Sequence, residues 1–258
     1  MSKLIWVLVL TVFLGLWAPG ELRADSFYPN AGVDTTDEAE TVPYHHGQVL
    51  LNSELDRPIA QPFYQMTTLA FKYGLSPRLD FGLQLPYTDY WNSSPYVSGF
   101  NDLQGGFKYL WTPNLEENRL LVSTIFSLKP DTADYKDDLG NGATDCALEL
   151  VVTHRLGRWA EHFNYGYNFL GTSPDTPRPN HPYYKFKIDR ECSQAFSLSA
   201  EIYGEDNADN DFNENTLQST VKFTYALSSN LSLDYGMAWG LNGRTPLRRN
   251  LFGFTWNF

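Results

Sequence analysis

The sequence predicts an all-β protein: a transmembrane, antiparallel, up-and-down β-barrel of twelve strands with both termini in the periplasm. Three observations lead to this fold. Apolar and polar residues alternate along about a dozen segments, short turns alternate with longer loops, and the chain ends in a strand with one wholly aromatic face. Because successive side chains of a strand point to opposite faces, each such segment has one apolar and one polar side.

The composition favours alternating strands over membrane helices. Aromatic residues make up 16% of the chain, yet the mean hydropathy is only -0.37. The net charge of -11 argues against nucleic acid as a partner, because phosphate binding needs a basic surface. The sequence shows no redox, phosphate-loop or metal-binding motif, so we expect no cofactor, no metal site and no catalytic residues.

The first 48 residues are expected to precede the barrel. Residues 1–24 have the features of a secretory signal peptide, with Lys3 before an apolar run and Ala24 at the cleavage position. Residues 25–48 are polar and are expected to form a periplasmic N-terminal segment, which leaves 49–258 for the transmembrane barrel. Neighbouring residues of an extended chain point to opposite sides, so we interpret His45 and His46 as a solvated pair.

The first half of the barrel is expected to contain six strands whose apolar residues recur at every second position. The strands and their apolar faces are 49–57 (Val49, Leu51, Leu55), 62–74 (Phe63, Leu69, Phe71, Tyr73), 79–88 (Leu79, Phe81, Leu83, Leu85, Tyr87), 101–111 (Leu103, Phe107, Tyr109, Trp111), 119–128 (Leu120, Val122, Phe126, Leu128) and 144–155 (Cys146, Leu148, Leu150, Val152). Residues 89–100, rich in Ser, Asn and Tyr, are expected to form a loop.

The second half follows the same plan. Its strands and apolar faces are 160–170 (Phe163, Tyr165, Tyr167, Phe169), 182–189 (Tyr184, Phe186, Ile188), 195–204 (Phe196, Leu198, Ala200, Ile202), 216–225 (Leu217, Val221, Phe223, Tyr225), 231–239 (Leu231, Leu233, Tyr235, Met237, Trp239) and 248–258 (Phe252, Phe254, Trp256, Phe258). Short turns follow the even-numbered strands and longer segments mostly follow the odd ones. Outer-membrane barrels have this asymmetry, with tight periplasmic turns and longer outer loops.

Alternation alone does not say which face is wet, and a soluble β-sandwich would bury its apolar face. Here the apolar face is nearly continuous, whereas the other face is rich in Gly, Ser, Thr, Asn and Gln. An exposed, strongly aromatic edge strand would aggregate unless lipid covers it. We therefore expect the outer membrane of a Gram-negative bacterium, with membrane lipid and lipopolysaccharide as partners. The strand ending at Phe258 resembles the C-terminal strand that the barrel-assembly machinery recognises.

The polar face supplies the candidate functional residues. They are Lys72, Asp80, Gln84, Asp102, Lys108, Glu149, Lys185, Lys187, Asp189, Glu201, Lys222, Asp234 and Arg249. One hypothesis is that they line an aqueous pore and set its electric field. The alternative is that they pair across a plugged lumen and stabilise a structural, non-conducting barrel.

Two acidic loops, 131–138 and 205–214, are expected on the outer side. They are either solvated or bind divalent cations that bridge lipid phosphates. Their spacing matches no calcium-loop template, because the required Gly and the bidentate Glu are misplaced.

Several stretches resemble outer-membrane proteins grouped as transporters of the meta-pathway of phenol degradation. The resemblance is carried by YGLSPRLDFGLQLPY at 73–87, FNDLQGGFKY at 100–109, LSAEIYG at 198–204 and LDYGMAWG at 233–240. It implies a channel-like barrel for uptake or efflux of small molecules, with aromatic or hydrophobic compounds as candidate permeants. It implies no defined binding residues.

An outer-membrane lipid hydrolase is the enzymatic alternative, and it needs a nucleophile beside a histidine base. His154 lies on the apolar face of its predicted strand, whereas Ser123 and Ser127 lie on the polar face of the neighbouring one. No such pair is expected to form, so we predict a protein that is not an enzyme.

Overall fold

The computed structural model describes residues 35–56, 63–91, 96–112, 119–137, 139–172, 179–206, 215–242 and 248–258. The predicted signal peptide, residues 1–24, lies outside this part of the chain. The strands are β1 (Gly47–Asp56), β2 (Phe63–Ser76), β3 (Leu79–Trp91), β4 (Val97–Phe100), β5 (Gln104–Leu110), β6 (Leu120–Lys129), β7 (Asp145–Leu156), β8 (Trp159–Phe169), β9 (His181–Glu191), β10 (Phe196–Glu205), β11 (Thr216–Ala226), β12 (Leu231–Gly240) and β13 (Arg249–Asn257). A short 3-10 helix, η1 (Tyr135–Asp137), lies between β6 and β7.

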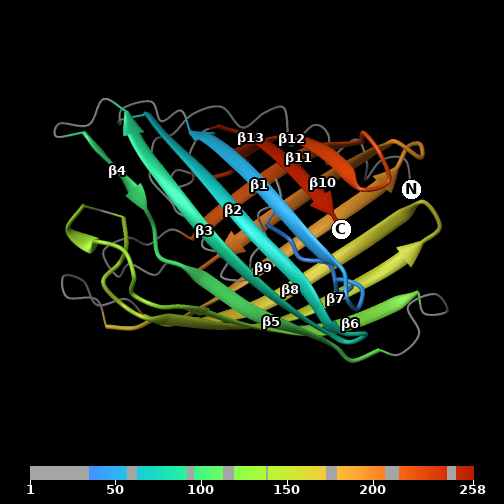
Figure 1. Cartoon of the computed structure of the whole chain (residues 1–258), viewed down its shortest axis with the longest axis horizontal. Coiled ribbons are helices and arrows are strands. Elements are labelled where there is room, and N and C mark those ends of the chain that lie inside the picture. The colour runs from blue at the N-terminus through green and yellow to red at the C-terminus, as the bar shows by residue number, and fades with distance from the viewer. Residues whose placement is uncertain are drawn as a thin grey trace.

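The strands form a closed barrel. Strand β1 pairs with β2 on one edge and with the last strand, β13, on the other, and all pairings between strands are antiparallel within the described residues. Strands β4 and β5 both pair with the same edge of β3, so they count as one interrupted strand of the wall. The predicted antiparallel barrel of twelve strands is confirmed (Figure 1).

The apolar faces point outward. Phe107, Tyr165 and Phe254 are 46%, 51% and 37% exposed, whereas their polar strand neighbours Lys108 and Asn164 are buried. Outer aromatic rings pack against one another across strands, with the rings of Phe81 and Phe107 5.3 Å apart and those of Tyr235 and Phe252 5.2 Å apart. A cylinder with an apolar exterior and a polar interior is what a lipid solvent selects.

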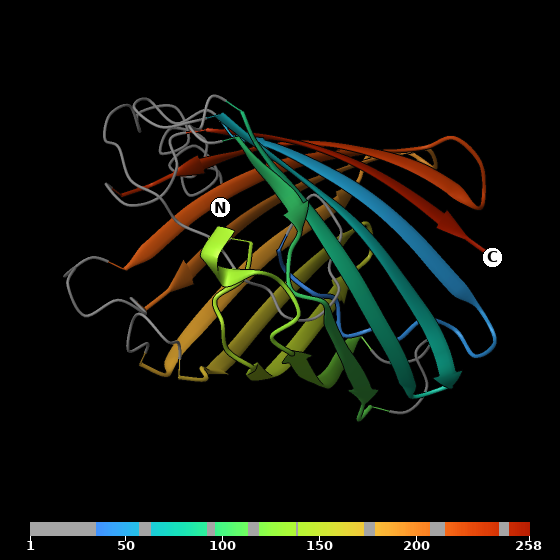
Figure 2. The same ribbon diagram turned by 60° about the vertical axis from the view of Figure 1, so that its left-hand side comes forward.

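The two ends of the barrel differ. The turn end holds the short turns at 77–78, 157–158, 192–195 and 227–230, together with Gly47 and Phe258. The opposite end, which we call the loop end, holds the β6–β7 connection with η1 (Figure 2). Whether the turn end faces the periplasm stays a prediction. No helix in the described part of the chain is long and apolar enough to cross a membrane.

Residues 89–100 differ from the predicted loop. Strand β3 continues to Trp91, and Val97–Phe100 returns along it as β4, with Tyr87 opposite Phe100. The aromatic rings of these two residues lie 5.2 Å apart. The Ser and Asn residues between the two segments led to the prediction of a loop, but aromatic contacts stabilise a pairing of strands here.

Candidate functional site: the lumen and its plug

All thirteen predicted lumen residues lie on the inner side of the wall. Ten are buried, and Asp189, Lys222 and Asp234 are intermediate in exposure. Their burial has an unexpected cause. Residues 35–46, which we call the plug, enter the barrel and cross its interior from β10 to the turn between β2 and β3 (Figure 2). The sequence placed residues 25–48 before the barrel; instead, 35–42 bind the inner wall, 43–46 are exposed at the turn end, and Gly47 and Gln48 belong to β1.

Wall side chains bind the backbone of the plug at several points. The Glu201 carboxylate accepts the N–H groups of Thr35 and Thr36 at 3.0 and 2.6 Å. The carboxylate of Asp80 accepts the N–H of Val42 at 2.8 Å. The ammonium of Lys108 donates to the carbonyl of Glu38 at 2.8 Å. Backbone groups without regular secondary structure need such partners when they are buried, so the wall residues serve as the plug's hydrogen-bonding frame.

The side chains of the plug are acidic and meet basic side chains. Asp37 lies 3.8 Å from the ammonium groups of both Lys108 and Lys185. Glu38 lies 3.1 Å from the ammonium of Lys187, and Glu40 forms an ion pair with Arg155. Because Glu38 faces the Lys187 ammonium, the pKa of this plug carboxyl is held below its usual value.

One apolar contact anchors the middle of the plug. Ala39 is fully buried in a cluster with Leu110, Leu121, Ile125 and Val151, and its N–H donates to Thr153 at 2.9 Å. Sequence reasoning missed this cluster. The signal in the sequence was the presence of large apolar residues at inward positions of strands whose outward positions are already apolar. In a solvated inner wall, such residues would expose apolar surface to water.

A glycine makes room where the plug leaves the lumen. Pro43 crosses the inner face of β2 at Gly74, and Tyr44 forms an isolated bridge with that residue. A Cβ at Gly74 would collide with the carbonyl oxygens of Val42 and Pro43. The inner face therefore needs a residue without a side chain at this crossing.

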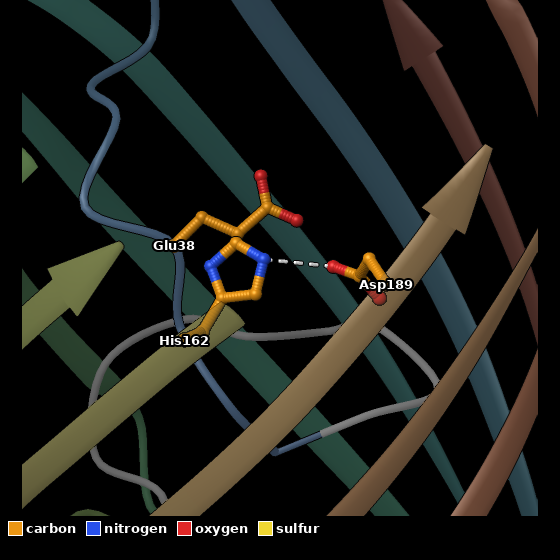
Figure 3. Close-up of side chains that lie close together, drawn as sticks. All are labelled: Glu38, His162 and Asp189. Carbon is orange, nitrogen blue, oxygen red and sulfur yellow. Dashed lines mark ion pairs between the residues drawn. The ribbon is translucent and has the colours of Figure 1, made fainter. Parts of the chain in front are cut away.

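Glu38, His162 and Asp189 converge where the plug meets β8 and β9 (Figure 3). The Nε2 of His162 lies 2.9 Å from Asp189, and its Nδ1 lies 2.9 Å from the hydroxyl of Thr153. One histidine and two carboxylates could ligate Zn²⁺. However, the Lys187 ammonium is 3.1 Å from both Glu38 and Asp189, so a cation already pairs with both carboxylates. We interpret it as an ion-pair latch.

Further charged groups pair within the wall itself. Glu149 binds Asn164, the hydroxyl of Tyr183 and the ammonium of Lys185. Tyr183 lies across the inner face of Gly166, where a side chain would collide with its ring. Arg249 lies 2.8 Å from Glu54 on the neighbouring strand. The Asp234 carboxylate accepts a hydrogen bond from Thr224, and Gln84 donates one to Gln104.

The acidic loop between β6 and β7 folds toward the loop-end mouth. Asp102 accepts the N–H groups of Thr132 and Ala133, both at 2.9 Å. Lys129 lies between Asp102 and Asp145, at 3.6 and 3.0 Å. The second acidic loop falls mostly outside the described residues, since only 205 and 206 are described. Cation binding by either loop stays untested.

Part of the inner wall is open to solvent. At the turn end of β11, β12 and β13, the inward residues Thr224, Asp234 and Thr255 are intermediate in exposure. The side chain of Glu38 is 53% exposed although it lies inside the barrel. A partly exposed polar surface therefore remains at the turn end of these strands, whereas their inward residues further along, such as Thr220, Ala238 and Arg249, are buried.

The residues considered for a hydrolase stay apart. Ser123 and Ser127 are buried on the inner face of β6. His154 lies on the partly exposed outer face of β7, with Nδ1 3.5 Å from Glu161. The barrel wall therefore separates this histidine from both hydroxyl groups.

The fold is similar to that of outer-membrane channels. The COG4313 outer membrane channel from Pseudomonas putida F1 superposes with a TM-score of 0.69 at 13% identity, covering 92% of this chain and all of that one. The KdgM porin gives 0.59 at 10% identity, over 82% of this chain and 99% of the porin. The P. putida toluene transporter TodX gives 0.52 at 9% identity, over 92% and 99%. At such identities the likeness shows the fold alone.

Sequence comparison gives the family. No curated protein matches the chain. The family model described as "putative MetA-pathway of phenol degradation" matches residues 19–258, which include every described strand. The chain therefore belongs to the family of proteins described as the putative MetA-pathway of phenol degradation.

Proposed function

We propose that this protein is a channel-like barrel in the outer membrane of a Gram-negative bacterium, through which small molecules pass passively in either direction. The observation that carries the proposal is the partly exposed polar surface beside the plug, formed by Glu38 and by Thr224, Asp234 and Thr255 at the turn end of β11–β13. A lumen used only for structural support would be filled evenly by side chains. The described state is a restricted one, because the plug covers the other side.

Conductance across planar lipid bilayers tests this proposal. Purified protein is expected to give discrete current steps, and displacing the plug is expected to enlarge them. A protein that shows the heat-modifiable gel mobility of a folded barrel but no current steps, with or without its plug, would contradict the channel function.

The ion pairs of the plug favour a second candidate, a structural barrel that does not conduct while its plug is in place. Asp37, Glu38 and Glu40 all meet basic wall residues, and buried ion pairs are costly to separate. The same recordings distinguish the two candidates, because a permanently closed barrel conducts only when its plug is altered.

Aromatic or hydrophobic compounds are the proposed permeants. The family description, phenol degradation, and the name of TodX as a toluene transporter support this class. Growth of a barrel-deficient strain on phenol, with and without this protein, tests whether phenol passes through the barrel. We expect faster growth at limiting phenol when the protein is present. Equal growth would remove aromatic compounds from the proposal and leave the channel intact.

We also propose membrane lipid, lipopolysaccharide and the barrel-assembly machinery as partners. The ring of Phe258 is 45% exposed and lies beside Trp256 and Phe71, at 5.1 and 6.3 Å between ring centres. It is thus available to another protein at the turn end. Phe258→Ala is expected to lower the amount of folded barrel in the outer membrane, and an unchanged amount would contradict recognition through this residue.

A further inference from the structure

The acidic residues of the plug indicate which chemical groups the inner wall binds. It carries three carboxylates within four residues, Asp37, Glu38 and Glu40. Each of them reaches a basic side chain that comes from the wall rather than from the plug, at β5, β7 or β9. The inner wall thus binds carboxylate groups, and in this structure those groups belong to the plug of the same chain.

Three ammonium groups form the centre of this site. Lys108 contacts Asp37 and two carbonyl oxygens of the plug. Lys185 lies between Asp37 and Glu149, and Lys187 between Glu38 and Asp189. Glu149 and Asp189 neutralise part of this charge, so the plug carboxylates act as second partners of two lysines. The side chain of Glu38 is 53% exposed, so the edge of the site borders space that the protein does not fill.

The geometry points to a binding site for small organic anions that carry carboxylate groups, formed by Lys108, Lys185 and Lys187 and occupied by the plug in the restricted state. The inference rests on the proposed function, because a permeant meets these lysines only inside a conducting barrel. When the plug withdraws, buried ammonium groups lose carboxylate partners, which is unfavourable. A carboxylate-bearing solute restores those partners, so it competes with the plug for the same lysines and promotes opening.

The test uses the full chain with its plug neutralised by Asp37→Asn, Glu38→Gln and Glu40→Gln. Citrate is the probe, and sucrose is the neutral control of similar size. In bilayers with a KCl gradient, this variant is expected to carry an anion-selective current that citrate blocks and sucrose does not. Adding Lys108→Gln and Lys187→Gln is expected to weaken the block about a hundredfold, about tenfold for each of the two charged contacts removed. Lys136→Gln, on the exposed η1 helix, removes the same charge outside the lumen and is expected to change nothing.

The outcomes separate the two proposals. A cation-selective current, or one that citrate leaves unchanged, overturns the anion site but leaves the channel standing. If no variant conducts, the channel function itself fails. A second measurement applies to the wild-type protein even if the variants do not fold: citrate is expected to speed hydrogen exchange of the plug amides 35–42. Exchange that is unchanged by citrate contradicts competition between citrate and the plug.

Discussion

The two sides of the inner wall follow the same alternation, yet they differ in what covers them. On β6, β7 and β9 the inward residues Leu121, Val151 and Lys185 have no exposed surface. On β11, β12 and β13, near the turn end, Thr224, Asp234 and Thr255 are partly exposed. The plug binds the first side through Lys185 and the Ala39 cluster, whereas the second side is open only near the turn end, since Thr220, Ala238 and Arg249 on the same strands are buried. Alternation along a strand decides which residues face lipid, but a segment outside the strands decides which inner residues remain wet.

The residue types on the two sides agree with this division. On the covered side, apolar side chains and long charged side chains point inward, where they contact the plug. Near the turn end the open side places small residues inward, among them Ser232, Gly253 and Thr255, although Lys222 and Arg249 also face inward on the same strands. Small side chains leave space for water, whereas the large ones opposite them are used for binding.

Placing a charge at the apolar anchor is expected to have the largest effect. Ala39→Arg buries a guanidinium in a cluster of Leu and Ile, which costs several kcal/mol, on the order of the largest single-residue effects. The plug should leave the lumen, and bilayer current should rise more than tenfold. Thr255→Arg puts the same side chain on the open side and should leave the plug in place. Equal currents from the two variants would contradict the division into a covered and an open side.

A side chain at position 74, where the plug crosses β2, is expected to have the second-largest effect. Gly74→Ala introduces a Cβ against two backbone carbonyl groups of the plug, at a cost of about 1–3 kcal/mol. We expect faster hydrogen exchange over residues 35–46, measured by mass spectrometry, while the amides of β12 stay protected. Uniformly faster exchange in both regions would instead indicate a general loss of barrel stability.

The ion-pair latch is expected to contribute less. Lys187→Gln removes the ammonium between Glu38 and Asp189, a loss of about 1–2 kcal/mol for charged hydrogen bonds that are partly solvated. Plug amides should exchange roughly tenfold faster. Replacing exposed Lys136 by Gln serves as the control. No change with Lys187→Gln would mean that the anchor at Ala39 holds the plug without the latch.

Acid is expected to loosen the plug to the smallest extent. Lys187 lowers the pKa of Glu38, so this carboxylate stabilises the bound plug fully above its ordinary pKa, about 4.3. That contribution is lost as the pH falls through the lowered value. Plug exchange, after correction for intrinsic rates, should be constant from pH 8 to 5 and rise below about pH 4. Glu38→Gln should remove this rise, and a rise already between pH 7 and 5 would contradict its assignment to Glu38.

The barrel wall could be predicted from the sequence because lipid imposes one simple period on every strand. Residues 144–155 and 216–225 were expected as strands, and β7 and β11 occupy 145–156 and 216–226. The plug could not be predicted in this way. Its residues are polar and have no period, and their bound conformation depends on groups such as Glu201, which are distant in sequence and adjacent only once the barrel has closed.

The anchor could have been inferred in part. Val151 and Ile125 are apolar at positions where the alternation demands a wet wall. Such exceptions indicate an internal partner, but they do not identify which segment supplies it. The pairing of each lysine was likewise beyond prediction, since both a neighbouring strand and the plug offer carboxylates within reach.

The seam between β1 and β13 ties assembly to closure of the passage. Gly47 and Phe258 exchange two backbone hydrogen bonds, of 2.8 and 2.9 Å, so the last residue of the chain bonds to the residue that follows the plug. The β1–β13 seam is therefore completed next to the residue at which the plug ends. It follows that removing Phe258 would take away the two hydrogen bonds that hold Gly47, and so would loosen the start of β1 next to the plug.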